Sequence, residues 1–138
     1  MDISKKDITF VIVTFASEKI ISDCLNSLPK ESKKIIIENS QNLSLKKELE
    51  TNYDNIEVII SENNGMGTSN NIGLKKCQSK FAYVINPDVR LKEDTIDKII
   101  KYVKVIDNFA IISPVNSNPN NPNYKIIKQL SDSKILEV

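Results

Sequence analysis

Residues 8–15 read ITFVIVTF, a run of β-branched and aromatic side chains with almost no polar alternation. A half-exposed strand alternates apolar and polar residues, whereas a strand covered on both faces is apolar throughout. The run therefore predicts a central strand of a parallel sheet with helices on both faces. An apolar stripe at helical spacing follows over residues 20–28, Ser17 stands where it can cap that helix, and Pro29 ends it.

The alternation of strand and helix continues along the chain. Further strands are predicted over residues 34–38, 56–60, 81–85 and 110–113, and further helices over 45–53, 68–77 and 93–104. Strands that alternate with helices indicate an α/β fold with a mostly parallel, doubly wound sheet, here in a single domain over 1–138. Proline and asparagine without periodicity predict a loop over 114–123, and one more strand is predicted over 124–130.

The composition limits the chemistry that the chain can perform. Its 138 residues carry a net charge of +1 and include no histidine. The balanced charge gives no general attraction to nucleic acid, so we expect no nucleic-acid partner. Without histidine there is no His-based triad and no His-ligated zinc. Cys24 and Cys77 lie in apolar-periodic segments, which predicts buried free thiols.

The start of the chain is too polar for a secretory signal, and no apolar run approaches the ~20 residues that span a bilayer. We therefore expect a cytoplasmic protein, and peripheral contact with the inner face of the membrane stays open.

Small polar residues gather where the predicted strands end. In a doubly wound sheet the ligand crevice lies outside the carboxyl ends of the strands. This rule selects four loops, at residues 14–17, 38–40, 61–67 and 86–88. We expect all four to lie along one edge of the sheet.

Asp88 closes the last of these loops, after Asn86 and Pro87. One interpretation is a turn in which asparagine and aspartate bond to the backbone and proline fixes φ. The other is a hard-cation ligand, because Mg²⁺ or Mn²⁺ needs only one or two protein carboxylates when phosphate oxygens complete its shell. The residues themselves leave both interpretations open.

The stretch ENNGMGTSNNIG, residues 62–73, begins like a dinucleotide-binding fingerprint. Asn70 stands where the third glycine would be, and the motif follows the third strand instead of the first, which disfavours a Rossmann cofactor site. A flexible turn at Gly65 that approaches a ligand, with the Asn71 amide nearby, competes with a plain strand–helix turn. Glu38 similarly either accepts the imide N–H of a pyrimidine or is a solvated strand terminus.

In this order and spacing, VIVTFAS, IENS, SENNGMGTSNNIG and VINPDV resemble the amino-terminal half of the inverting GT-A glycosyltransferases of family 2. The nearest in pattern is the bacterial rhamnosyltransferase-like group, and the resemblance runs from about residue 8 to 114. It implies a site for a UDP- or dTDP-linked sugar formed by Thr14, Phe15, Glu38, Asn39, Asn63, Gly65, Asn71 and Asp88.

The resemblance also implies a metal and a reaction. The family's Asp-x-Asp metal motif falls on Asn86, Pro87 and Asp88, so the first aspartate is replaced. Mg²⁺ or Mn²⁺ would then be held by Asp88 and the donor diphosphate. The implied reaction is hexosyl transfer, with inversion, to a hydroxyl of a glycan or lipid-linked acceptor. The family's catalytic base lies downstream of this motif and has no recognisable match here, so we expect the donor-binding half alone.

Three functions stay open at this point. The chain is a glycosyltransferase, a nucleotide-sugar-binding remnant or partner subunit without catalysis, or an unrelated flavodoxin-like regulatory domain. The sequence TFAS at 14–17 counts against the third, because a phospho-accepting regulator needs acidic residues there. A sheet that stops after the donor half also leaves an exposed edge, from which we expect self-association.

Overall fold

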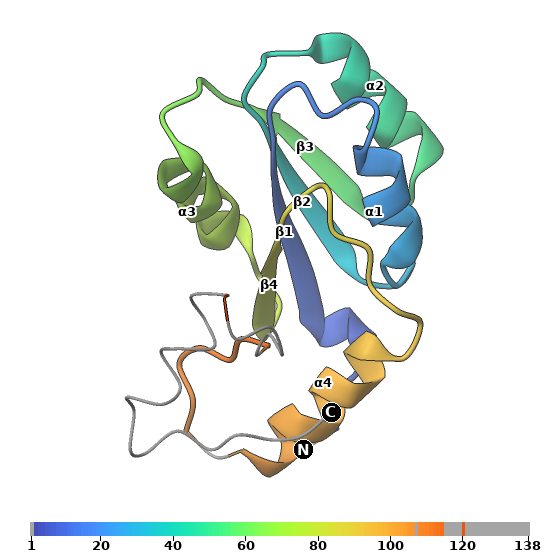
Figure 1. Cartoon of the computed structure of the whole chain (residues 1–138), viewed down its shortest axis with the longest axis vertical. Coiled ribbons are helices and arrows are strands. Elements are labelled where there is room, and N and C mark those ends of the chain that lie inside the picture. The colour runs from blue at the N-terminus through green and yellow to red at the C-terminus, as the bar shows by residue number, and fades with distance from the viewer. Residues whose placement is uncertain (1, 107, 115–119, 121–138) are drawn as a thin grey trace. The chain divides into compact units, whose positions relative to one another are not determined.

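The computed structural model describes residues 2–106, 108–114 and 120, and one compact unit, residues 1–100, contains the whole sheet. Its four strands are β1 (Ile8–Thr14), β2 (Lys33–Glu38), β3 (Ile56–Ile60) and β4 (Phe81–Ile85). All three strand pairs are parallel, and the strand order is β3-β2-β1-β4 (Figure 1). The predicted α/β fold with a parallel, doubly wound sheet is confirmed.

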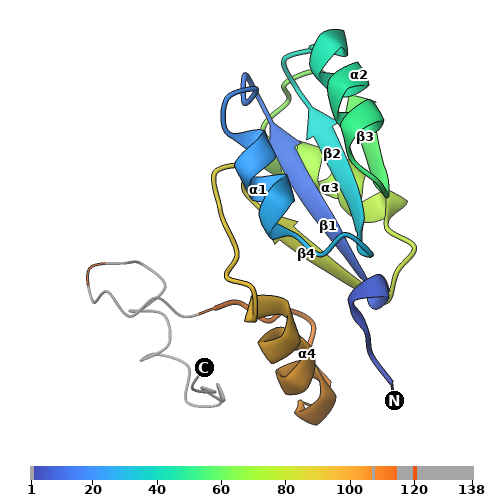
Figure 2. The ribbon, with the colours of Figure 1, turned by 90° about the vertical axis from the view of Figure 1, so that its right-hand side faces the viewer.

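The helices are α1 (Ile21–Ser27), α2 (Leu43–Asn52), α3 (Met66–Lys76) and α4 (Thr95–Val105), and a 3₁₀ turn, η1 (Lys5–Asp7), precedes β1. Helices α1 and α2 cover one face of the sheet and α3 covers the other (Figures 1 and 2). Crossovers between parallel strands are right-handed. The chain steps from β1 outward to β3 and then returns past β1 to β4, so the reversal of direction moves α3 to the opposite face.

Strands β1 and β2 form the centre of the core. Phe10, Val11 and Ile12 of β1, and the three isoleucines 35–37 of β2, are all fully buried. Because helices cover both faces of these strands, apolar side chains are needed on both sides of the backbone. This two-sided burial is the physical origin of the continuous apolar run in residues 8–15.

The predicted capping role of Ser17 is wrong. Its hydroxyl accepts a hydrogen bond from the N–H of Phe15 at 3.3 Å instead of from the helix. Its carbonyl oxygen accepts from the N–H groups of Ile20 and Ile21, at 3.1 and 3.0 Å. The chain therefore makes an additional turn at Ser17, and α1 begins only at Ile21.

The strand predicted over residues 110–113 is also wrong. These residues adopt no strand conformation, and Ile111 is 87% exposed. A short apolar segment becomes a strand only where a neighbouring strand pairs with it, and the described residues provide none at this point. The strand predicted over 124–130 lies outside the described residues.

Gly73 allows α3 to pack closely on β1, and this contact yields a test of the fold. A Cβ atom on Gly73 would lie 2.4 Å from Cγ1 of the buried Val11, whereas a Cβ on Gly67 would meet nothing within 4 Å. We expect Gly73→Ala to lower the free energy of unfolding by about 2 kcal/mol through overpacking. Gly67→Ala should leave it unchanged or raise it by up to about 1 kcal/mol. Urea unfolding measures both, and equal stabilities would contradict the close approach.

Candidate functional site

The carboxyl ends of the strands lie together, as predicted. Thr14 is in register with Glu38, and Glu38 with Ile60, so β1, β2 and β3 end side by side. On the other side of β1, strand β4 runs parallel to it and ends at Ile85. The order of strands reverses between β1 and β4. Ligands of doubly wound sheets bind at this switch point, which here lies between the loops at 14–17 and 86–88.

A buried carboxylate joins the ends of β1 and β2. Glu38 is 0% exposed, and its Oε2 accepts a hydrogen bond from Thr14 Oγ1 at 2.5 Å. Its Oε1 accepts from the backbone N–H of Ser40 at 2.7 Å and also from the Ser40 hydroxyl. The alternative of a solvated strand terminus is therefore wrong. Glu38 organises the strand ends in this structure, and its contact with a pyrimidine stays a prediction.

Asn39 connects the end of β2 to strand β1 and to helix α3. Its backbone N–H donates to the carbonyl oxygen of Thr14 at 2.8 Å, and its Nδ2 donates to Ser69 Oγ on α3 at 2.7 Å. Its Oδ1 atom is buried and has no hydrogen-bond partner within the part of the chain that the structure describes. A buried acceptor without a partner is costly, so this atom is a natural acceptor for a donor group of a ligand or for a water molecule.

The turn before α3 is open to solvent. Gly65 has a φ of +91°, a conformation that favours glycine, and a Cβ there would meet nothing within 4 Å. Asn63 and Asn71 are exposed, as is Phe15 on the neighbouring loop. The turn geometry accounts for the glycine, and the same openness leaves the backbone accessible. Contacts of these residues with a nucleotide stay predictions.

Asp88 is exposed and lies in a turn that is closed by a 3.2 Å hydrogen bond from the Val89 N–H to the Asn86 carbonyl oxygen. The predicted turn is thus present. Nothing within the described residues hydrogen-bonds or ion-pairs with the Asp88 carboxylate, and they contain no cluster of three or more acidic, cysteine or histidine side chains that could hold a metal. Asp88 therefore fits Mg²⁺ or Mn²⁺ only as a single protein ligand, with oxygens of a bound diphosphate completing the coordination of the ion.

Comparison with known proteins identifies the family. The model of glycosyl transferase family 2 matches residues 9–136, which is most of the chain. The chain belongs to glycosyl transferase family 2. The flavodoxin-like alternative is therefore wrong. No curated protein matches this family 2 chain.

Solved structures of S. aureus TarS share the fold of this family 2 chain. TarS 1–349 matches with a TM-score of 0.59 at 21% identity, and its complex with UDP gives the same values. The complex of TarS 1–349 with UDP-GlcNAc matches with a TM-score of 0.60 at 22% identity. These matches cover 70% of this chain and 31% or 32% of TarS 1–349, so the chain spans about a third of that length. At such identities the likeness establishes the fold alone.

Cys24 contacts the loop that carries Asp88, and the sequence analysis did not predict this contact. Its thiol is 1% exposed and donates to the carbonyl oxygen of Asn86 at 3.7 Å. Burial, and to a smaller extent the negative charge of Asp88, raise the pKa of the Cys24 thiol from 9.0 to about 11. The thiol therefore stays protonated, and able to donate, across the neutral pH range.

This thiol gives a pH-dependent prediction. Both cysteines are free, as predicted, but Cys77 is only half-buried. At pH 8 we expect Ellman's reagent to modify Cys77 in the folded protein and Cys24 only after unfolding. Folding raises the pKa of the Cys24 thiol. The contribution of the protonated thiol to the free energy of unfolding should therefore be complete below pH 9 and lost as the pH rises through about 11. Simultaneous reaction of both native thiols would contradict the buried position of Cys24.

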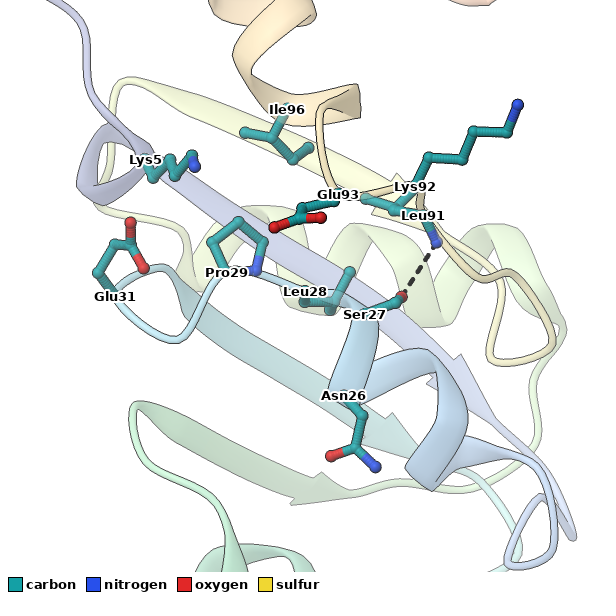
Figure 3. Close-up of a pocket in the computed structure, with 10 residues that line it drawn as sticks. All are labelled: Lys5, Asn26, Ser27, Leu28, Pro29, Glu31, Leu91, Lys92, Glu93 and Ile96. Carbon is teal, nitrogen blue, oxygen red and sulfur yellow. Dashed lines mark hydrogen bonds between the residues drawn. The ribbon is translucent and has the colours of Figure 1, made fainter.

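A separate hollow of about 340 Å³ opens near the carboxyl end of α1 (Figure 3). Lys5, the turn that includes Pro29, and the segment with Leu91 and Ile96 contribute to its wall. Lys5 belongs to η1, the turn that leads directly into β1, so this wall of the hollow lies at the amino end of that strand. It is therefore distinct from the carboxyl edge that carries Asp88.

Among the described residues of the chain, no helix is long and apolar enough to cross a membrane.

Proposed function

We propose that the chain binds a UDP- or dTDP-linked sugar at the carboxyl edge of the sheet, between β1 and β4. The observation that carries the proposal is an exposed Asp88 carboxylate with no bonding partner in the described structure, at the switch point of a family 2 fold. TarS 1–349 has been solved with UDP and with UDP-GlcNAc, which supports a uridine nucleotide as the first ligand to test.

Each residue of the edge has a part in the proposed complex. Asp88 holds one position on a Mg²⁺ or Mn²⁺ ion, which would stabilise the leaving diphosphate as a Lewis acid. The open backbone at Gly65, with Asn63 and Asn71 beside it, approaches the ribose and the edge of the base. The exposed ring of Phe15 is available to the base on the other side, and the buried Oδ1 of Asn39, which has no partner among the described residues, lies beneath that side. Thr14 and Glu38 keep the two strand ends together beneath it.

Family membership supports glycosyl transfer as the reaction, and transfer of a hexosyl group with inversion to a glycan or lipid-linked acceptor completes the proposal. The motif pattern suggests, more specifically, that the transferred hexosyl group is rhamnose. The acceptor hydroxyl needs a carboxylate placed to take its proton. Glu38 is enclosed by hydrogen bonds and Asp88 is assigned to the metal, so neither is proposed as that base.

Calorimetric titration tests the nucleotide site directly. UDP and dTDP are titrated into the protein with and without Mn²⁺. We expect at least one nucleotide to bind, and Mn²⁺ to tighten its binding about tenfold or more, equivalent to about 1.4 kcal/mol. Failure of both nucleotides to bind would contradict the proposal.

Nucleotide-sugar binding without catalysis is the second candidate function. It is favoured because neither Glu38, which is enclosed by hydrogen bonds, nor Asp88, which is assigned to the metal, is free to take the proton of an acceptor hydroxyl. Incubation with UDP-GlcNAc and Mn²⁺, followed by measurement of released UDP, distinguishes the two. Without an added acceptor the sugar can pass only to water. Release of UDP above the rate in buffer supports a transferase, whereas binding without release of UDP, also after addition of a glycan acceptor, supports the second candidate.

The two edges of the sheet differ in a way that bears on self-association. On β3, the N–H of Val58 donates to Glu50 Oε1 at 2.9 Å and its carbonyl oxygen accepts from Lys46 Nζ at 2.6 Å. Side chains of α2 thus occupy backbone groups that another strand would need. Over residues 82–85 of β4, the described chain supplies no such side-chain hydrogen bond, and Val84 is 46% exposed. We propose that self-association uses the edge of β4.

Light scattering at high protein concentration tests this edge. We expect the protein to associate and Val84→Lys to reduce the association, because a charge on an edge strand opposes pairing. Leu43→Lys, at an exposed apolar residue of α2, should have no such effect. A monodisperse monomer at every concentration would count against the proposal.

A further inference from the structure

Helix α1 contacts the loop that carries Asp88 at two partly buried points. The Cys24 thiol donates to the carbonyl oxygen of Asn86 at 3.7 Å, and the Leu91 N–H donates to Ser27 Oγ at 3.0 Å (Figure 3 shows the second contact). Residues three apart on a helix lie on the same side, so Cys24 and Ser27 face the loop together. The two contacts lie on either side of Asp88 in the sequence.

A third contact is more exposed. Arg90 forms an ion pair with Asp23, and both side chains are largely exposed to solvent. Exposed ion pairs contribute little to stability. The two hydrogen bonds made by Cys24 and Ser27 are therefore the polar contacts that we expect to contribute most to holding the loop on α1.

The first contact acts on the turn that carries Asp88. The Asn86 carbonyl oxygen accepts both the Cys24 thiol and the Val89 N–H that closes the turn. Pro87 restricts its own φ to about −65°, which leaves few free torsions between Asn86 and Asp88. Fixing the Asn86 carbonyl group therefore restricts where Asp88 can lie.

We propose that Cys24 and Ser27 are positioning residues for Asp88. They hold the loop at residues 86–91 in one arrangement before ligand arrives, so that less conformational freedom is lost when a metal and a diphosphate bind. This inference rests on the proposed function, because it assigns to α1 the placement of the proposed metal ligand. It requires no change in the chemistry of Asp88 itself.

Amide hydrogen exchange and calorimetry test the proposal on Ser27→Ala. Ser22→Ala is the matched control, since Ser22 is an exposed serine on the same helix with no side-chain hydrogen bond among the described residues. Ser27→Ala removes the acceptor of the Leu91 N–H, and also the hydrogen bond that Ser27 Oγ donates to the Cys24 carbonyl oxygen at 2.7 Å. Loss of the first should speed exchange at Leu91 and Val89 about threefold to tenfold. The factor by which Mn²⁺ tightens UDP binding should fall by about the same amount, while UDP binding without metal stays constant.

Cys24 provides a second pair of variants. Cys24→Ser keeps a donor at this position and Cys24→Ala removes it, so the alanine variant should lose more of the Mn²⁺ effect than the serine variant. Exchange rates and Mn²⁺ effects that are equal in Ser27→Ala and Ser22→Ala would overturn the inference alone. Wild-type protein that binds UDP equally with and without Mn²⁺ would overturn the proposed role of the metal, and the inference with it.

Discussion

Asp88→Asn should abolish the Mn²⁺-dependent part of UDP binding, with a loss of about tenfold or more in affinity when Mn²⁺ is present. Asparagine has nearly the same shape and is equally suited to a turn, so the loop should be preserved. The substitution removes the negative charge, and Mg²⁺ and Mn²⁺ are bound through carboxylate oxygens in sites of this kind. Calorimetric titration of UDP, with and without Mn²⁺, measures the change.

Two controls make the Asp88 result specific. Thermal unfolding of Asp88→Asn should match that of the wild type, because the described residues offer this carboxylate no hydrogen bond or ion pair to lose. Glu62→Gln removes another exposed carboxylate that follows β3 at the same edge, and it should leave the Mn²⁺ effect intact. If Asp88→Asn retains the Mn²⁺ effect of the wild type, the metal site is not at Asp88.

Glu38→Ala should lower the free energy of unfolding by about 3 kcal/mol, the largest effect on stability that we predict. The substitution removes the acceptor for the Thr14 hydroxyl and for the N–H and hydroxyl of Ser40. Thr14 is buried, so little water can replace the lost partner there, and the other acceptor of its hydroxyl, the Ile37 carbonyl oxygen, lies at 3.4 Å. Urea or thermal unfolding measures the loss.

Glu38→Gln is the informative companion of the alanine variant. Glutamine fills the same volume, can still accept from Ser40, and can donate to the rotatable hydroxyl of Thr14, so it should recover most of the stability. Its effect on UDP binding then reports on the predicted pyrimidine contact separately from folding. A Glu38→Ala protein as stable as the wild type would show that the buried network contributes little.

The sheet could be predicted from the sequence because its central strands are buried on both faces. Continuous apolar runs such as residues 8–15 arise from that environment, and they identify their strands without knowledge of the neighbours. The shorter run at 110–113 also has adjacent isoleucines, yet it forms no strand in the structure. Strand formation depends on a partner, which local sequence does not reveal.

The site could be predicted only as a set of loops. The topology rule placed Glu38 and Asp88 at the same edge, but the surroundings of each depend on distant residues. The acceptor role of Glu38 depends on Thr14, which is 24 positions away, and the hydrogen bond between Cys24 and Asn86 joins residues 62 positions apart. No local pattern marks such pairs, so the burial of one carboxylate and the exposure of the other became evident only in three dimensions.

Lys46 and Glu50 occupy the carbonyl oxygen and the N–H of Val58 on β3, which opposes the addition of a strand at this edge of the sheet. We therefore expect a strand that joins the sheet from another molecule to do so next to β4. The newcomer would then form a wall beside the Asp88 turn. If the chain binds a donor there, as proposed, we expect that binding to change with protein concentration.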